Sequence, residues 1–256
     1  MNYQIKIISA ICTTLFFISC SDKEDHSLNK NYETDMEVSY NGNVYKIIEY
    51  NGLKWLDRNL GAKVTCASPK GGAECLGNLY QWGRIEDGHE KLNSPISEKQ
   101  IVNCNNISNG SFIVNTIEGD LRSDEIIAKY ANQTWFNSCN IEQLWNENGN
   151  GFNEICPTGW HVATKQDFES LHAANAKDAY DKVKLVLSGS RLALRRKHIK
   201  PEIVNRNIIG EYWTSSISRN HPISFIFSAN NKPIFSESQV VTGKAVRCVK
   251  NVQTSY

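Results

Sequence analysis

The residues of this chain with the clearest chemical potential are its cysteines, one of which lies close to a histidine. Cys156 and His161 belong to the segment Cys-Pro-Thr-Gly-Trp-His. A cysteine beside a histidine can act as a nucleophile, but only when its thiolate is free. Cysteines of exported chains are usually paired. We therefore predict a structural disulfide at Cys156 and no catalytic residue.

The number of cysteines supports this prediction. Cys12 lies inside an N-terminal apolar run and Cys20 follows its end, which leaves six: Cys66, Cys75, Cys104, Cys139, Cys156 and Cys248. An even number in an exported chain predicts three disulfides, and the lack of a Cys-x-x-Cys motif argues against a zinc ribbon or a thioredoxin site. Many pairings are possible. We favour 66–75, 104–139 and 156–248, because the last closes the longest loop and stabilises by on the order of 4–5 kcal/mol.

The N-terminus predicts export and a lipid anchor. Residues 1–19 have Lys6 and an apolar run too short to span a bilayer, as in a signal peptide. The ending Ser19-Cys20 resembles the lipobox of bacterial lipoproteins, although Phe17 departs from it and an ordinary secretory signal is the alternative. Residues 21–25 resemble the acidic tag of Bacteroidetes surface lipoproteins. We expect Cys20 to be the lipid anchor, 20–35 a polar tether, and the protein to face outward from the outer membrane.

Composition favours one globular domain with an insertion. The chain has 256 residues, of which 40% are hydrophobic and 21% charged, and a formal net charge of +1. A near-neutral chain is not a dedicated nucleic-acid binder. We expect no cofactor.

Turn and cap signals predict the elements that would position these residues. Asn-Gly pairs at 41–42 and 51–52 separate expected strands at 38–40, 44–49 and 53–56. Thr164 and Asp167 form a capping-box-like pair before an expected helix at 165–175, with Phe168, Leu171 and His172 on one face. A second helical segment is expected near 178–187. Further strands are expected at 212–216, 224–228, 234–238 and 245–250, so the fold class is α+β, ending in a β meander.

Residues 88–154 form a long insertion with few periodic signals, a predicted disulfide and a short predicted helix at 124–130. Long loops often carry binding residues. We predict a ligand-binding face at Trp135, Phe136 and Trp145, with packing against the domain as the alternative. A second candidate is the basic run, with Arg195 and Arg196 at its centre; it suits a solvated loop or a contact with anionic glycans. This run consists of Arg191, Arg195, Arg196, Lys197, His198 and Lys200.

Four ordered blocks resemble the Fibrobacter succinogenes major paralogous domain, a family of exported bacterial proteins. They lie at 45–60, 77–84, 156–164 and 212–216 with 246–249. The resemblance implies a domain at about 36–252 with a C-type-lectin-like fold. Such a fold has a small mixed sheet, a flanking helix and a disulfide joining the helix region to the last strand, a role that the 156–248 pair fits.

The resemblance also bears on residue roles. The tryptophans inside the blocks are expected to be core residues: Trp55, Trp82, Trp160 and Trp213. We expect His161 and His172 to be core or boundary residues and not ligands. The chain lacks the Trp-Asn-Asp and Glu-Pro-Asn motifs of calcium-dependent lectins, so no metal site is predicted. Sulfatase-modifying oxidases have a related fold but need a cysteine pair, and the late part of this chain has only Cys248.

These observations favour a surface lipoprotein that acts as a non-catalytic binding or adhesion module, with a glycan as one candidate ligand. The alternative is a structural component of the cell envelope or of a surface assembly. An enzyme of unknown type is the third hypothesis. The identity of the ligand does not follow from the sequence.

Overall fold

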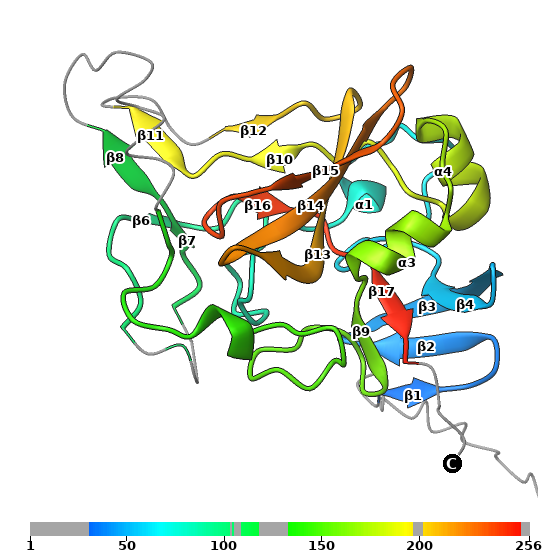
Figure 1. Ribbon diagram of the computed structural model, residues 1–256, viewed down its shortest axis with the longest axis horizontal. Coiled ribbons are helices and arrows are strands. Elements are labelled where there is room, and N and C mark those ends of the chain that lie inside the picture. The colour runs from blue at the N-terminus through cyan, green and yellow to red at the C-terminus, as the bar shows by residue number, and fades with distance from the viewer. Residues whose placement is uncertain (1–30, 103, 105–108, 118–132, 197–201, 252–256) are drawn as a thin grey trace, which may run out of the picture.

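The computed structural model describes residues 31–102, 104, 109–117, 133–196 and 202–251. The signal peptide, Cys20 and the predicted helix at 124–130 lie outside these residues. Within them the chain is an α+β fold in which strands predominate over short helices (Figure 1). None of the helices in these ranges is long and apolar enough to cross a membrane.

The largest sheet has six antiparallel strands in the order β1-β2-β3-β4-β17-β9. They are β1 Tyr32–Glu33, β2 Glu37–Tyr40, β3 Asn43–Tyr50, β4 Leu53–Leu56, β17 Cys248–Lys250 and β9 Trp160–Val162. Both predicted Asn-Gly turns are present: Asn41, Gly42, Asn51 and Gly52 all have positive φ, as a two-residue hairpin turn requires.

Strand β1 corrects the expected start of the domain. The polar tether was predicted to run to residue 35, but Tyr32 and Glu33 pair with β2. Glu33 also accepts a hydrogen bond from the Trp160 indole N–H (3.2 Å) and forms an ion pair with Lys250. The sheet edge therefore begins inside the segment that composition alone marked as a linker.

The remaining strands form four smaller sheets. An antiparallel meander consists of β13 Ile209–Ser218, β14 His221–Ser228 and β15 Ile234–Glu237. A four-stranded sheet has the order β12 Ile203–Val204, β10 Ser190–Arg191, β16 Gly243–Lys244 and β5 Tyr80–Gln81. Two parallel pairs join β11 Leu194–Arg196 to β8 Asn115–Ile117, and β6 Ile96–Ser97 to β7 Phe112–Ile113. Of the strand expected at 245–250, only Cys248–Lys250 is a strand, β17, and β16 lies just before the expected range.

Helix α3, Lys165–Ser170, begins at the predicted capping box. The Thr164 hydroxyl accepts from the Asp167 N–H, and the Asp167 carboxylate accepts from the Thr164 N–H. The helix is shorter than predicted, because His172 adopts a left-handed conformation (φ 45°) and is exposed. The chain then begins α4, Ala176–Val183, with Asn175 as N-cap. Two shorter helices are α1, Ala73–Leu76, and the 3-10 helix η1, Ile141–Gln143.

All three predicted disulfides are present, with Cα–Cα distances of 5.0 Å for Cys66–Cys75, 6.0 Å for Cys104–Cys139 and 5.8 Å for Cys156–Cys248. The last joins the segment before β9 to β17. The four tryptophans of the blocks are fully buried, as predicted: Trp55, Trp82, Trp160 and Trp213. They belong to two apolar clusters, one beneath the α3 and α4 helices and one toward the insertion.

The described parts of the insertion contribute to the core. Phe112, Ile113 and Leu144 are buried in the same apolar cluster as Trp82 and Trp213. The side chain of Asn153 donates to the carbonyls of Gly83 and Cys104 and so ties the end of the insertion to its start. The described parts of the insertion are therefore fastened to the rest of the domain.

Candidate functional site

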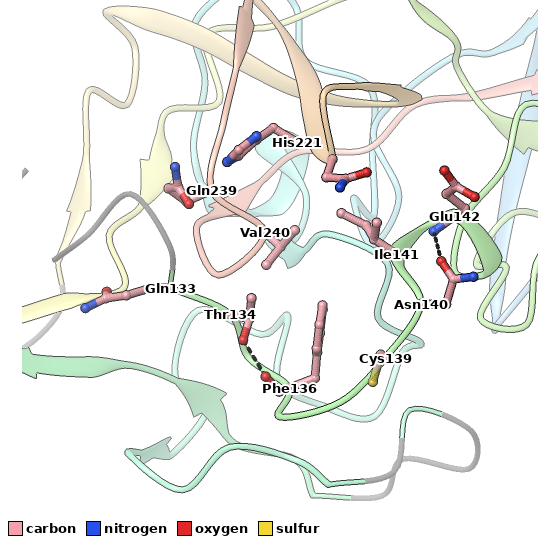
Figure 2. A pocket seen from close by; sticks show the side chains of 11 residues that line it. Gln133, Thr134, Phe136, Cys139, Asn140, Ile141, Glu142, His221, Gln239 and Val240 are labelled. Atoms are coloured by element: carbon pink, nitrogen blue, oxygen red, sulfur yellow. Dashed lines mark hydrogen bonds between the residues drawn. The ribbon is translucent and has the colours of Figure 1, made fainter. Parts of the chain in front are cut away.

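A surface pocket of about 510 Å³ lies where the insertion meets the meander. We call it the insertion pocket. The segment at 133–142 lines one side, and the turn between β13 and β14 with the turn after β15 lines the other (Figure 2). Its lining residues are Gln133, Thr134, Phe136, Cys139, Asn140, Ile141, Glu142, Asn220, His221, Gln239 and Val240. A pocket of this volume is within the range typical of ligand sites.

Local structure fixes the insertion side of the pocket. The Asn140 side chain caps η1 by accepting from the Glu142 N–H at 3.0 Å. The Thr134 hydroxyl donates to the Phe136 carbonyl, and the Gln100 amide donates to the Thr134 carbonyl at 2.9 Å. The Cys104–Cys139 disulfide fastens the same segment. These bonds fasten the wall at several points along its length.

The pocket has an apolar centre and a polar rim. Figure 2 shows the side chains of Phe136, Ile141 and Val240 together in the middle, with amides and the His221 ring around them. Among the described residues, the Gln239 and Asn220 side chains have no hydrogen-bond partner. An amide can both donate and accept, so these two groups are available to a ligand.

Phe136 is the one predicted ligand-face aromatic that lines the insertion pocket; it is 8% exposed. The prediction is wrong for Trp135 and Trp145, which are fully buried. Their indole N–H groups donate to the backbone carbonyls of Trp82 and Asn153 at 2.7 and 2.8 Å. A tryptophan that satisfies its polar atom internally and buries its whole ring is a core residue.

The basic run does not form one solvated loop. Arg191 is buried: its guanidinium donates to the Ser94 hydroxyl at 2.6 Å and lies 4.1 Å from the centre of the Phe112 ring. The backbone of Arg195 and Arg196 pairs with β8 in strand β11. Lys197, His198 and Lys200 lie outside the described residues. The ligand-binding role of Arg195 and Arg196 stays a prediction.

Sequence reasoning missed the meander side of the pocket. Asn220, His221 and Gln239 are separated from Phe136 by more than 80 positions. Asn220 does carry a local signal, because Arg219-Asn220 forms a tight turn with positive φ at both residues. That signal predicts a turn but not what the turn packs against.

Asp87, His89 and Glu90 place ligand-type atoms within 4.8 Å of one another. The His89 Nδ1–H donates to Asp87 (2.7 Å), His89 Nε2 accepts from the Gln81 N–H (3.1 Å), and the Arg84 guanidinium donates to Asp87 (2.6 Å). Burial lowers the pKa of His89 to about 4 despite the carboxylate beside it. A neutral imidazole with both nitrogens engaged beside a buried cation suits a structural loop closure, so we do not assign a metal here.

A more polar hollow of about 640 Å³ contains His161 and Asp167. His161 Nε2 lies 2.9 Å from Asp167 Oδ2, and its Nδ1 lies 2.7 Å from Asn251 Oδ1. Asp167 also accepts two hydrogen bonds from Thr164 as part of the α3 cap. Because both groups are fully engaged in fixing β9, α3 and the end of β17, His161 is a boundary residue, as predicted.

The fold and the pocket define a disulfide-linked, strand-rich α+β domain with a largely uncharged surface pocket. Comparisons with protein-family models, curated proteins and solved structures returned no match. The functional argument therefore depends on the geometry of this chain alone.

Proposed function

We propose that this protein is a lipid-anchored surface lipoprotein whose domain binds a ligand, with a glycan as the favoured class, in the insertion pocket. The observation that supports this most is the pocket itself: a rigid wall, an apolar centre and unpaired amides at one concave site. Such a combination is typical of binding sites. The described part of the pocket offers no activated nucleophile, so binding fits it better than catalysis.

We further propose membership of the Fibrobacter succinogenes major paralogous domain family and a C-type-lectin-like fold. Supporting this, the third and fourth resembling blocks lie side by side, because β9 pairs with β17 and the Cys156–Cys248 disulfide joins them. The position of that bridge agrees with the role that the resemblance implies for it.

The pocket proposal is tested by binding of the mature protein to an array of glycans, followed by titration of any that bind. Gln239→Ala removes an unpaired amide of the rim and should weaken binding roughly 2- to 12-fold, the worth of one hydrogen bond. Gln166→Ala on the exposed face of α3 is the matched control. Equal loss in both variants, or loss in neither, would place the ligand elsewhere. If no glycan binds and a pull-down recovers envelope proteins instead, the result supports the alternative that the protein is a structural component of the cell envelope.

The anchor is tested separately. Cys20→Ser should move the protein from the membrane fraction to the soluble fraction, since no acyl chain can then be attached. Protease treatment of intact cells tests the outward orientation. An unchanged membrane fraction for Cys20→Ser contradicts the lipoprotein proposal and leaves the pocket proposal standing.

A further inference from the structure

A second, smaller hollow adjoins the insertion pocket on the other side of Cys139 and Asn140. Its volume is about 200 Å³. We call it the Phe152 hollow, after one of its walls. Cys139 and Asn140 line both hollows, so the two hollows are neighbours that meet at this short stretch of chain. The Cys104–Cys139 disulfide and the Asn140 cap of η1 hold that stretch in place.

The walls of the Phe152 hollow expose apolar side chains to solvent. Val102 is 68% exposed and Phe152 60% exposed, two of the most exposed large apolar residues of the described chain. Solvent-exposed apolar groups that gather at a concavity mark contact surfaces. The volume of the hollow is below the usual range for an independent ligand site. These properties suit an extension of the neighbouring pocket better than a separate site.

The charge of the two hollows restricts the ligand. Among the described residues that line the two hollows there is no lysine or arginine, and Glu142 is the one carboxylate. A polyanion or a polycation would find no complementary charge there. Amides and hydroxyls predominate instead, and both donate and accept hydrogen bonds, as sugar hydroxyls do. Phe152 supplies an exposed aromatic face for the apolar face of a sugar ring, and the largely buried Phe136 contributes to the apolar centre of the insertion pocket.

We infer that the insertion pocket and the Phe152 hollow are consecutive subsites for a neutral oligosaccharide, with Asn140 between them. The inference rests on the proposed binding function and adds that the ligand is a chain of sugar units. The Asn140 side-chain oxygen already accepts from the Glu142 N–H, so its amide nitrogen is the group left to donate to the ligand at the junction. Because the disulfide and the η1 cap already hold Asn140 in place, less conformational entropy is lost when a ligand binds to it.

The test is calorimetric titration of the mature, disulfide-intact protein with ladders of neutral gluco-, manno- and N-acetylglucosamine oligosaccharides, from monosaccharide to hexasaccharide. Affinity should rise with chain length until both subsites are filled and then level off. Phe152→Ala should remove most of that rise, about 5- to 150-fold for a lost aromatic contact, and leave binding of the shortest ligand unchanged. Ile208→Ala, 62% exposed and outside both hollows, is the control and should change neither quantity.

The outcomes separate the two proposals. Affinity that is independent of chain length, or a length dependence that Phe152→Ala does not change, overturns the two-subsite inference. If Gln239→Ala still weakens binding in that case, the insertion pocket remains the binding site of the proposed function. If no neutral saccharide of any length binds, both the inference and the glycan form of the proposed function are wrong. Binding of a peptide, and of no saccharide, at the same surface would likewise contradict both.

Discussion

At the residue scale, three buried tryptophans join distant segments of the chain through their indole N–H groups. Trp82, Trp135 and Trp213 each donate an indole N–H to a backbone carbonyl at 2.7 Å. Each bond ties one segment to a distant one, since the acceptors are Thr214, Trp82 and Tyr80. The buried aromatic rings thus join the insertion, the 77–84 block and the meander.

Truncating Trp135 should therefore unfold the protein more easily. We expect Trp135→Ala to lower the free energy of unfolding by about 3–5 kcal/mol, from lost burial and the cavity left behind. Urea denaturation measures this, with Phe152→Ala as the exposed aromatic control, for which a much smaller change is expected. If Trp135→Ala were as stable as the wild type but bound ligand more weakly, Trp135 would be a ligand contact and not a core residue.

His161 gives the stability a defined pH dependence. Burial disfavours its charged form, but hydrogen bonds to Asp167 and Asn251, and the charges of Asp167 and Glu154, outweigh burial and raise its pKa. The folded state therefore binds the proton more tightly than the unfolded state does. This stabilisation is complete below the unfolded pKa of about 6.5 and is lost as pH rises through the higher folded value.

The expected result is a free energy of unfolding that falls as the pH rises from about 6.5 through the folded pKa of His161. His161→Gln should remove that slope, whereas His172→Gln, at an exposed position, should retain it. His89 has the opposite effect: its pKa of about 4 makes stability fall as pH drops from about 6.5 toward 4. A His161→Gln variant with the wild-type pH profile would contradict the assignment.

At the element scale, the best-specified unit is the start of α3. The Thr164 hydroxyl accepts from the Asp167 N–H at 3.0 Å, and the Asp167 carboxylate accepts from the Thr164 N–H at 2.8 Å. These bonds satisfy orphan donors at the helix start. The same carboxylate contacts His161. The cap therefore couples α3 to β9, the strand that ends next to it.

We expect Thr164→Ser to be nearly neutral and Thr164→Ala to cost about 0.5–2 kcal/mol of stability, the usual worth of an N-cap. Thermal or urea unfolding of the pair gives the contribution of the hydroxyl directly, because both variants lack the methyl group and only Thr164→Ala also lacks the hydroxyl. Equal stability of the two variants would mean that the hydroxyl contributes nothing.

Local signals predicted local elements, and tertiary contacts decided the rest. The Asn-Gly turns and the Thr164–Asp167 cap act over a few residues, so the hairpins and the start of α3 follow from the sequence. The early end of α3 depends on His172 in a left-handed conformation, which its residue type does not announce. Strand β1 owes its pairing to β2 and to the Trp160 and Lys250 partners of Glu33, which are distant in the sequence.

At the scale of the whole molecule, three disulfides close loops of very different length. Cys156 and Cys248 are 92 positions apart, whereas Cys66 and Cys75 are 9 apart. The first bridges β17 to the segment before β9, and the second closes the loop that ends inside α1. In the chain-entropy treatment the Cys156–Cys248 bridge contributes about 4.6 kcal/mol of stability and the Cys66–Cys75 bridge about 2.6 kcal/mol.

Replacing Cys156 and Cys248 together by serine should therefore destabilise the protein more than the same change at Cys66 and Cys75, by about 2 kcal/mol. Urea unfolding of the two double variants gives the comparison, and replacing both members of each pair leaves no unpaired thiol. A larger loss for the short loop would indicate that native-state contacts, and not loop closure, set the contribution.

The candidate site is a property of the assembled molecule. Phe136 was predicted to contact ligand because it lies in the insertion, and it does line the insertion pocket. Its neighbours Trp135 and Trp145 had the same sequence signal and are buried, because aromatic character does not tell an inward from an outward side chain. Gln239 and His221 reach the pocket only through the turns that flank β14 and β15. No local pattern specifies that approach.

The most direct test of the pocket is amide hydrogen exchange of the mature protein with and without a saturating neutral oligosaccharide that binds it. We expect slower exchange at residues 133–142, 220–221 and 239–240, which form the two walls of the insertion pocket. Exchange at 165–170, around the polar hollow beside α3, should stay unchanged. Protection confined to 165–170, or no protection in either wall at full saturation, would contradict the assignment of the binding site to the insertion pocket.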